Sequence, residues 1–281
     1  MQQLPTLEDD GRLLQEVGEW GATKYALVKH YAEMFATSMK EKWDSRVYID
    51  LFAGAGRARL EESRRIIPTS AFLTLGVRQP FDSYVLCELV ASNVDALRAR
   101  VEREPLASRV AIVHGDCNVQ ASAIVEKLPT PSSTHRVLGF CLADPFRLRD
   151  LKFRTISTLS ERFVDFLVLI PSYMDAHRNL DAYLDSRSTV VSEFLGDPSW
   201  REQWRRRIDQ RAPQEFGLFV VDQFGHAMKR EGFLYAGLGD EVPVRDRGRL
   251  LYHLAFFSRS ELGMKFWREA RRSSNQQMDL L

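Results

Sequence analysis

The chain has 281 residues, 44% of them hydrophobic, and a formal net charge of +1 at pH 7. This apolar share supports one large α/β domain, and the small net charge excludes a global field that would by itself recruit nucleic acid or a membrane. No apolar run approaches the roughly 18–20 residues that span a bilayer, and the N-terminus lacks the pattern of a signal peptide, so we expect a cytoplasmic protein.

The first 20 residues are polar and have no firm period, after which apolar residues recur at helical spacing over 24–43. We therefore interpret 1–45 as a helical N-terminal segment. Five strands are predicted next, and the first and the last two are near-continuous apolar runs, typical of parallel strands covered on both faces. The predicted strands span 46–52, 83–89, 109–115, 136–144 and 163–171. Helical patterns separate them, which predicts a doubly wound sheet.

The second half of the chain has a different character. Residues 172–212 are polar, basic and helical in pieces, and we interpret them as an insertion or cap. A long helix over 214–231 precedes two strand candidates within 232–258, separated by a short connection rich in Pro, Gly, Asp and Arg. The connection is too short for a crossover helix, so the two strands should pair antiparallel. A short basic helix at about 260–272 follows.

Together these patterns predict a single domain over 1–281. Its fold class is α/β: a Rossmann-like, doubly wound, mostly parallel sheet of about seven strands, with a terminal antiparallel pair and a helical insertion. The cysteines, Cys87, Cys117 and Cys141, are far apart and lie in or beside apolar stretches. They lack the spacing of a metal site, so we predict three reduced, buried thiols and no metal centre.

Four consecutive predicted strands carry a carboxylate at their carboxyl ends. Asp50 leads into the small-residue loop "FAGAG", and Glu88, Asp116 and Asp144 end the next three strands. Ligands of open α/β sheets bind at this edge. Taken singly, each acid has a plain structural explanation; Asp116, for example, suits the cap of the following helix. Taken together, they predict a ligand site, because gathered carboxylates repel one another unless a ligand or backbone N–H groups use the charge.

The identity of the ligand depends on the motifs. The chain has no P-loop, and it matches the dinucleotide fingerprint poorly, since Arg59 stands where a third glycine belongs. The order "DLFAGAG", an acid after the second strand, "GD" and "DPF" resembles class I S-adenosylmethionine-dependent methyltransferases. This resemblance implies that backbone at 53–56 approaches the methionine part of the cofactor, that Glu88 accepts the ribose hydroxyls and that Asp116 faces the adenine amine. The implied cofactor residues are Asp50, Phe52, Ala53, Gly54, Gly56, Glu88 and Asp116.

A closer resemblance covers about residues 20–270. Trp20 and Lys24, "YIDLFAGAG", "HGDCN", "ADPFRLRDLKF", "FLGDPSW" and "LLYHLAFFSRSELGMKFW" resemble the bacterial three-Cys-motif partner family. The resemblance implies a methyltransferase-like fold and a separate partner protein that carries a three-cysteine, iron–sulfur-like motif. The chain departs from the family pattern at Ala55, around Ser70 and at Arg147, and the last departure puts a guanidinium at the mouth of the acceptor site.

Asp144, Pro145 and Phe146 are also similar to the "D-P-P-[YF]" of amino methyltransferases, in which a carboxylate and a carbonyl hold the amine and a ring stacks on the base. Methyl transfer needs mainly alignment, so a single acid can suffice. We therefore predict methylation of a nucleic-acid base or another amine, with these three residues as the catalytic set. Two alternatives stay open: a non-catalytic recognition partner of the iron–sulfur protein, and a Mg²⁺-dependent nuclease that uses Asp50, Asp116 and Asp144.

A basic strip occupies residues 200–211, where arginines are interleaved with Trp200 and Trp204. Such a strip is able to bind nucleic acid through phosphate contacts and stacking, or to dock the partner protein. The alternative is an amphipathic helix whose tryptophans face the core. The predicted contact residues are Arg147, Arg205, Arg206 and Arg207.

Overall fold

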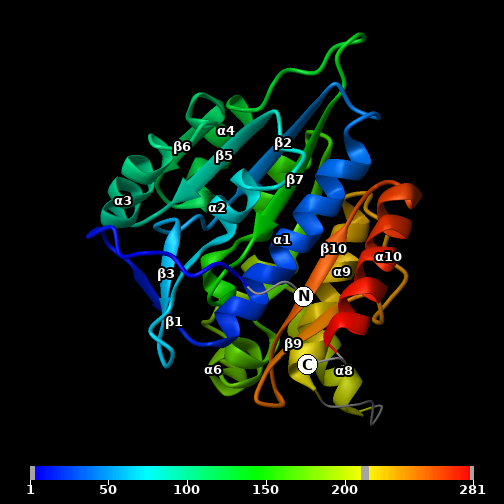
Figure 1. Ribbon diagram of the computed structural model, residues 1–281. Helices are drawn as coiled ribbons and strands as arrows, with labels where there is room; N and C mark the ends of the chain where they lie inside the picture. Colours follow the sequence, from blue (N-terminus) through cyan, green and yellow to red (C-terminus); the bar gives the residue numbers. More distant parts are fainter. Residues whose placement is uncertain (1–3, 210–214, 279–281) are drawn as a thin grey trace. The chain divides into compact units, whose positions relative to one another are not determined.

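The computed structural model describes residues 4–209 and 215–278. Its main sheet is built from β2 (Ser45–Asp50), β5 (Ser83–Glu88), β6 (Val110–His114), β7 (Val137–Ala143), β8 (Val164–Ile170), β9 (Val242–Asp246) and β10 (Arg249–Phe257). The seven strands have the order β6-β5-β2-β7-β8-β10-β9 (Figure 1). β2 pairs parallel with β5 and β7, and β5 with β6, whereas β10 is antiparallel to both β8 and β9. The predicted mostly parallel sheet with a terminal antiparallel pair is confirmed.

The described helices include those that the strand–helix alternation predicted between the strands. They are α1 (Trp20–Met39), α2 (Ser70–Leu75), α3 (Ala91–Val101), α4 (Cys117–Glu126), α5 (Phe153–Leu159), α6 (Leu180–Leu184), α7 (Val190–Leu195), α8 (Trp200–Asp209), α9 (Phe216–Arg230) and α10 (Glu261–Met278). Single turns of 3₁₀ helix lie at Ala107–Arg109 and Leu148–Asp150, and a short π-helix at Ser172–His177. The stretch predicted as helical pieces, 172–212, is helical in pieces as far as Asp209, and its last residues lie outside the described ones.

The chain forms two compact units. Unit 1 comprises 1–142, 162–165 and 265–281, and unit 2 comprises 143–161 and 166–264. The predicted cofactor residues all fall in unit 1. The predicted acceptor residues and α8 fall in unit 2. The interpretation of 1–281 as a single domain stays a prediction.

Aromatic side chains build the core of unit 1 between α1 and the sheet. Phe35 of α1 lies with its ring centroid 4.7 Å from that of Phe140 on β7, and Tyr48 of β2 lies 5.6 Å from Phe81. Trp267 of α10 packs 4.5 Å from Tyr31. Such tilted aromatic pairs bury large apolar areas and fix the register of helix against sheet. The three cysteines are buried, as predicted.

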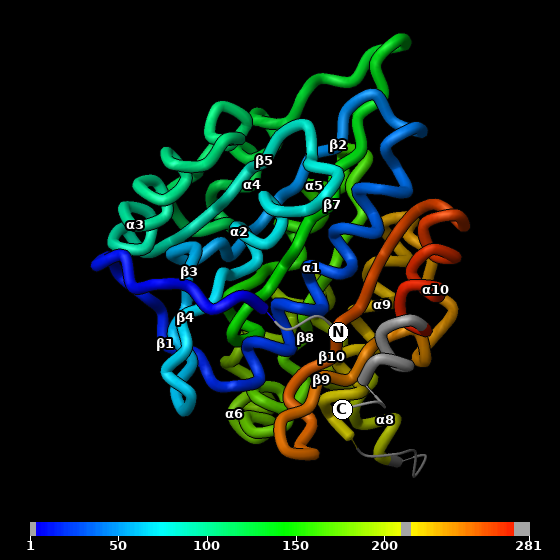
Figure 2. Tube along the Cα trace, in the orientation of Figure 1, coloured from blue at the N-terminus to red at the C-terminus, as the bar shows by residue number. Residues whose placement is uncertain are grey.

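A second, three-stranded sheet in unit 1 was not predicted. β1 (Gln15–Val17) pairs parallel with β3 (Arg57–Leu60), which pairs antiparallel with β4 (Ile66–Pro68) (Figure 2). The N-terminal segment, interpreted as helical over 1–45, therefore also contains the strand β1. Ala58 and Leu60 of β3 are fully buried while the alternating arginines are partly exposed. Strands of three or four residues are too short for this period-2 pattern to stand out from the sequence.

Both strands of the antiparallel pair lie within 232–258, as predicted. The connection between β9 and β10 is the two-residue turn Arg247–Gly248. Both turn residues have positive φ, +47° and +79°, the geometry of a tight hairpin. Pro243 is tolerated because β9 is an edge strand.

Candidate functional site

The loop that follows β2 in unit 1 is closed by hydrogen bonds to the chain itself. Ala53 N–H donates to the Cys87 carbonyl at 2.9 Å, and Thr69 N–H donates to the Gly56 carbonyl at 3.0 Å. Gly54 and Gly56 have φ of +64° and +86°, a region that favours glycine. The sequence-predicted loop is therefore a fixed turn that joins the ends of β2 and β5.

Asp50 supports this loop from inside. Its carboxylate is fully buried and accepts hydrogen bonds from Tyr48 Oη at 3.1 Å, Phe52 N at 3.0 Å and Ser70 Oγ at 2.7 Å. These donors explain how a carboxylate can stay buried. Burial, together with the Asp50 charge, raises the pKa of Tyr48 well above its usual value, so its hydroxyl stays a donor. Asp50 thereby ties β2 to the loop and to the first turn of α2.

Glu88 is held by backbone and amide donors at the end of β5. Gly54 N–H donates to Oε2 at 2.8 Å, while Val90 N–H and the Asn93 amide donate to Oε1 at 2.8 and 3.1 Å. Each carboxylate oxygen has room for two donors, so Oε2 keeps one acceptor position. The side chain is 7% exposed. The carboxylate is thus oriented by the fold and able to accept one further hydroxyl.

Asp116 caps α4. Its Oδ1 accepts from both the backbone N–H and the side-chain amide of Asn118, each at 2.8 Å. Gly115 N–H donates to the Glu88 carbonyl at 2.9 Å, which brings the ends of β5 and β6 together. The structural explanation of Asp116 as a helix cap is confirmed. Its role toward an adenine amine stays a prediction.

Three large apolar side chains lie exposed beside these two acids. Leu89, Val90 and Val119 are 63%, 48% and 71% exposed. We call them the apolar shelf. Leu89 and Val90 follow Glu88 directly along the chain, Val119 lies three residues after Asp116, and β5 pairs with β6 up to Glu88 opposite His114. Exposed apolar side chains near oriented polar ones are typical of a surface that receives a flat apolar ligand.

Thr69 is a residue that sequence reasoning missed. It precedes α2, is 1% exposed, and its Oγ1 has no hydrogen-bond partner. A buried hydroxyl without a partner is uncommon and fits a missing polar group of a ligand. Its only sequence signal was its place before Ser70 at the start of a helix. The free Thr69 hydroxyl and the apolar shelf both fit an adenosyl cofactor at this loop.

Side chains of the protein itself pack against the two glycines of this loop. A Cβ at Gly54 would overlap the side-chain oxygen of Gln15 on β1, and a Cβ at Gly56 would overlap the ring of Phe72 on α2. The glycines are therefore required by the packing of this chain, apart from any need of a ligand for close approach. The sequence did not predict this packing, because Gln15 lies in the N-terminal segment that was interpreted as helical.

The predicted catalytic loop lies in unit 2, directly after β7. Asp144 is partly buried, and Phe146 is 60% exposed with the Arg147 guanidinium carbon 5.5 Å from its ring centroid. Arg147 N–H donates to Asp150 Oδ2 at 2.8 Å, which begins the 3₁₀ turn. The loop thus presents an aromatic ring and a cation to solvent.

Asp175 anchors this loop from behind and was missed in the sequence. It is 4% exposed, and its Oδ2 accepts from Leu148 N and Tyr183 Oη, both at 2.7 Å. The Asn179 amide donates to Oδ1 at 2.7 Å. Burial, with Asp175 as hydrogen-bond partner, raises the pKa of Tyr183 above its usual value. The available signal was an acid in the stretch after the fifth predicted strand.

The tryptophans of α8 face the core of unit 2, as the alternative interpretation held. Trp200 and Trp204 are 0% and 3% exposed and pack on Phe216. Arg201 donates to the carbonyls of Tyr183, Asp185 and Ser188. The remaining described arginines of the strip differ from one another: Arg205 is exposed, Arg206 pairs with Glu202, and Arg207 lies 3.7 Å from Asp222. Nucleic-acid or partner contact through them stays a prediction, and Arg211 lies outside the described residues.

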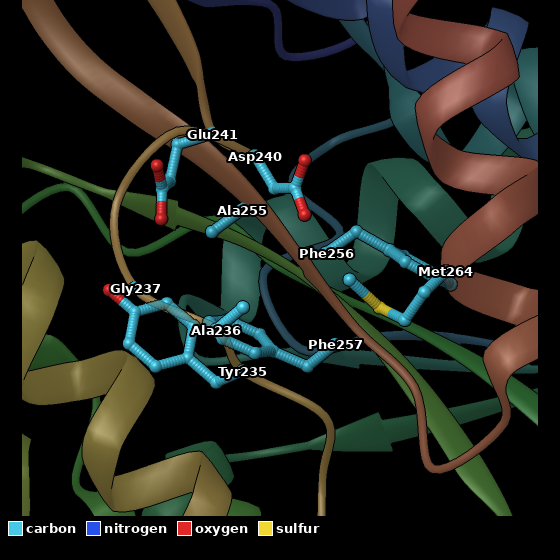
Figure 3. Close-up of a pocket in the computed structure, with 9 residues that line it drawn as sticks. All are labelled: Tyr235, Ala236, Gly237, Asp240, Glu241, Ala255, Phe256, Phe257 and Met264. Carbon is cyan, nitrogen blue, oxygen red and sulfur yellow. The ribbon is translucent and has the colours of Figure 1, made fainter.

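A separate recess in unit 2 contains none of the predicted site residues. Tyr235, Phe257 and Met264 line it together with the carboxylates of Asp240 and Glu241 (Figure 3). Burial raises the pKa of Glu241, whose Oε2 accepts from Gly239 N–H at 2.8 Å. Over 4–209 and 215–278, no group of three His, Cys, Asp or Glu side chains is arranged to hold a metal ion. No helix within these ranges has both the length and the apolar content to cross a bilayer.

No family model and no curated protein matches this chain. Among solved structures, protein LPL1258 of Legionella pneumophila, from the DUF519 family, is 13% identical over 85% of this chain and 88% of its own, with a TM-score of 0.46. The CcbJ methyltransferase of Streptomyces caelestis is 16% identical over 51% of each chain, with a TM-score of 0.29. The glycopeptide N-methyltransferase MtfA, solved with S-adenosylmethionine, is 17% identical over 50% of each chain, with a TM-score of 0.26. The Rossmann-like fold of this chain rests on its own strand order and pairing.

Proposed function

We propose that this protein binds S-adenosylmethionine through unit 1 and transfers its methyl group to an amine, in particular the amine of a nucleic-acid base. The observation that carries the proposal is the combination at the ends of β5 and β6: an oriented Glu88 with one free acceptor position, beside an exposed apolar shelf. A carboxylate suits ribose hydroxyls, and an apolar shelf suits a purine ring. The strand order, with its switch beside β2, supports the same position for the ligand.

The loop after β7 would supply the groups that bind the acceptor. When bound, the cofactor would supply an electrophilic methyl group, and the amine would take this methyl group in exchange for one proton. Asp144 would orient the amine, the exposed ring of Phe146 would stack on the base, and Arg147 would contact a phosphate. Joint action with a three-Cys-motif iron–sulfur protein belongs to the same proposal and is supported by the sequence resemblance.

Titration calorimetry with S-adenosylmethionine and with S-adenosylhomocysteine tests the cofactor site. Val119→Asp puts a charge on the shelf at a position that is 71% exposed, so we expect Kd to rise at least about tenfold with an unchanged Tm. The matched control is Leu262→Asp, at an exposed apolar position of unit 2 outside the proposed site, with unchanged Kd. Asp144→Ala should also keep wild-type affinity, because this acid is assigned to the acceptor. Equal affinities for wild type and Val119→Asp would remove the shelf from the site.

A second candidate function, the non-catalytic recognition partner, is favoured by one observation. Gln15 fills the space at Gly54 where a ligand would make its closest approach. Calorimetry separates the two candidates, since a recognition partner would bind neither S-adenosylmethionine nor S-adenosylhomocysteine in any variant.

A further inference from the structure

The N-terminal segment 8–16 lies over a loop that is far better buried than the segment itself. Of residues 8–16, all of them described, none is buried, and Leu13 is 45% exposed. The loop residues 53–56 beneath them are all buried. Apolar contacts flank the segment, since Leu4 belongs to a small core cluster and Val17 packs against it, and its last two residues, Gln15 and Glu16, pair with β3. A segment with few buried apolar contacts between two anchors has a low local stability.

One buried guanidinium connects this segment to the glycine loop. Arg100 of α3 is 2% exposed, and its Nε and Nη2 donate to the two carboxylate oxygens of Asp10 at 2.8 and 2.7 Å. Its Nη1 donates to the carbonyls of Leu13 at 2.9 Å and Ala55 at 2.6 Å. A two-pronged pair of this kind is strong and directional. The Arg100 hydrogen bond lowers the pKa of Asp10 far below its usual value, so the pair is ionised at neutral pH.

We propose that residues 8–16 are a cover that must withdraw the Gln15 side chain before S-adenosylmethionine reaches Gly54, and that the Asp10–Arg100 pair is its latch. This inference rests on the proposed function. Gln15 is the side chain that occupies the glycine face, and Arg100 holds the cover and the loop with the same nitrogen. Gly11, with φ of +70° and open space around its α-carbon, gives the cover a pivot between its anchors.

Binding by a protein that is mostly closed is weakened by the small fraction that is open. Gln15→Ala removes the occupant, and Asp10→Asn loosens the latch. Both should lower the Kd for S-adenosylhomocysteine, by about five- to tenfold for the first. The matched control is Asp9→Asn on the same segment. It breaks the ion pair between Asp9 and Arg59 of β3 and leaves Arg100 untouched, so Kd should not change. A weaker affinity in Gln15→Ala would overturn the proposal, because Gln15 would then be a ligand contact in a fixed wall.

Hydrogen exchange of the amides of residues 8–16 supplies a readout that is independent of affinity. Without ligand, Asp10→Asn should exchange faster than wild type and than Asp9→Asn. In wild type, S-adenosylhomocysteine should increase exchange in this segment, whereas a fixed wall would be protected by the ligand. Protection, or equal exchange in the two aspartate variants, would overturn the cover. If no variant binds either ligand, the proposed function and the cofactor part of this inference both fail, while the ligand-free exchange still judges the latch by itself.

Discussion

The loop after β2 in unit 1 and the loop after β7 in unit 2 end strands of the same sheet, yet they are built in opposite ways. In the first, Gly54 and Ala55 are buried and their polar atoms are taken by Glu88 and Arg100. In the second, one buried acid, Asp175, holds the backbone from behind and leaves Phe146 exposed. A loop that its own chain satisfies has to be opened before it binds, whereas a loop held only from behind presents its side chains at once.

The largest expected effect concerns the support of the second loop. Asp175→Ala leaves the Leu148 N–H and the Tyr183 hydroxyl without their acceptor, and we expect it to lower the free energy of unfolding by about 3 kcal/mol or more. Urea unfolding measures this. Asp185→Ala is the control, since that carboxylate pairs with Arg187, a side chain 90% exposed, and should cost less than about 1 kcal/mol. Equal losses in the two variants would mean that Asp175 does not anchor the loop.

A pH-dependent loss of stability should come from the same unit. His253 of β10 is buried, its Nδ1 lies 2.8 Å from Ser172 Oγ, and burial lowers its pKa to about 4, with a smaller contribution from Arg245. The unfolded chain takes up this proton near pH 6.5, before the folded chain does. The contribution is therefore complete above pH 6.5 and falls by about 3 kcal/mol at most as the pH drops to 4.

Urea unfolding at several pH values, from about 7.5 to about 4, measures the free energy of unfolding across this window. His253→Gln should flatten the decline over that range. His226→Gln, at a side chain 48% exposed, should leave it as in wild type. If both variants decline like wild type, the His253 imidazole is accessible to protons in the folded protein.

A double-mutant cycle sharpens the account of the first loop. Gly54→Ala in wild type meets both the Gln15 side chain and the strain of φ +64°, and we expect a loss of about 2 kcal/mol. In a Gln15→Ala background only the strain is left, so the loss should shrink by about 1 kcal/mol. Thermal unfolding of the four proteins measures the coupling. A coupling of zero would show that Gln15 is not the reason for glycine at position 54.

The sequence predicted the parts of the fold that rest on local periodicity. Long apolar runs marked β7 and β8, and helical spacing marked α1, because each pattern extends over several residues of the same segment. β1 and β3 escaped prediction, since each has only three or four residues, and the partner of β1 lies about 40 residues away. Pairing over that distance leaves no trace in a local window.

The residues of the candidate site differ in the same way, in whether a local pattern in the sequence marks them. Glu88 and Asp116 were predicted as site residues because they lie at or just after strand ends, and strand ends of a parallel sheet meet at one edge. Arg100 and Gln15 were not, because their contacts with the loop depend on the course of the N-terminal segment. Asp175 was passed over for the same reason: its partners, Leu148 and Tyr183, belong to different elements.

The smallest expected effect concerns the exposed arginines of α8 in unit 2. Arg201 and Arg207 are engaged within unit 2, so Arg205 is the appropriate residue to replace. If α8 contacts nucleic acid, Arg205→Gln should reduce the slope of log affinity against log salt by about 0.7–0.9, the share of one phosphate. Fluorescence anisotropy with a labelled oligonucleotide over a salt series measures the slope.

The control for this salt series is Arg187→Gln, an exposed arginine of unit 2 outside α8 that pairs with Asp185. Its slope should equal that of wild type. If α8 instead docks the three-Cys-motif partner, Arg205→Gln would weaken co-purification with that partner and leave the slope unchanged. A protein unaltered in both assays would reduce the exposed arginines of the strip to the solvated face of a helix that buries Trp200 and Trp204. Contact with an acceptor would then depend on the exposed side chains of the loop after β7, which include Phe146, Arg147 and Arg149.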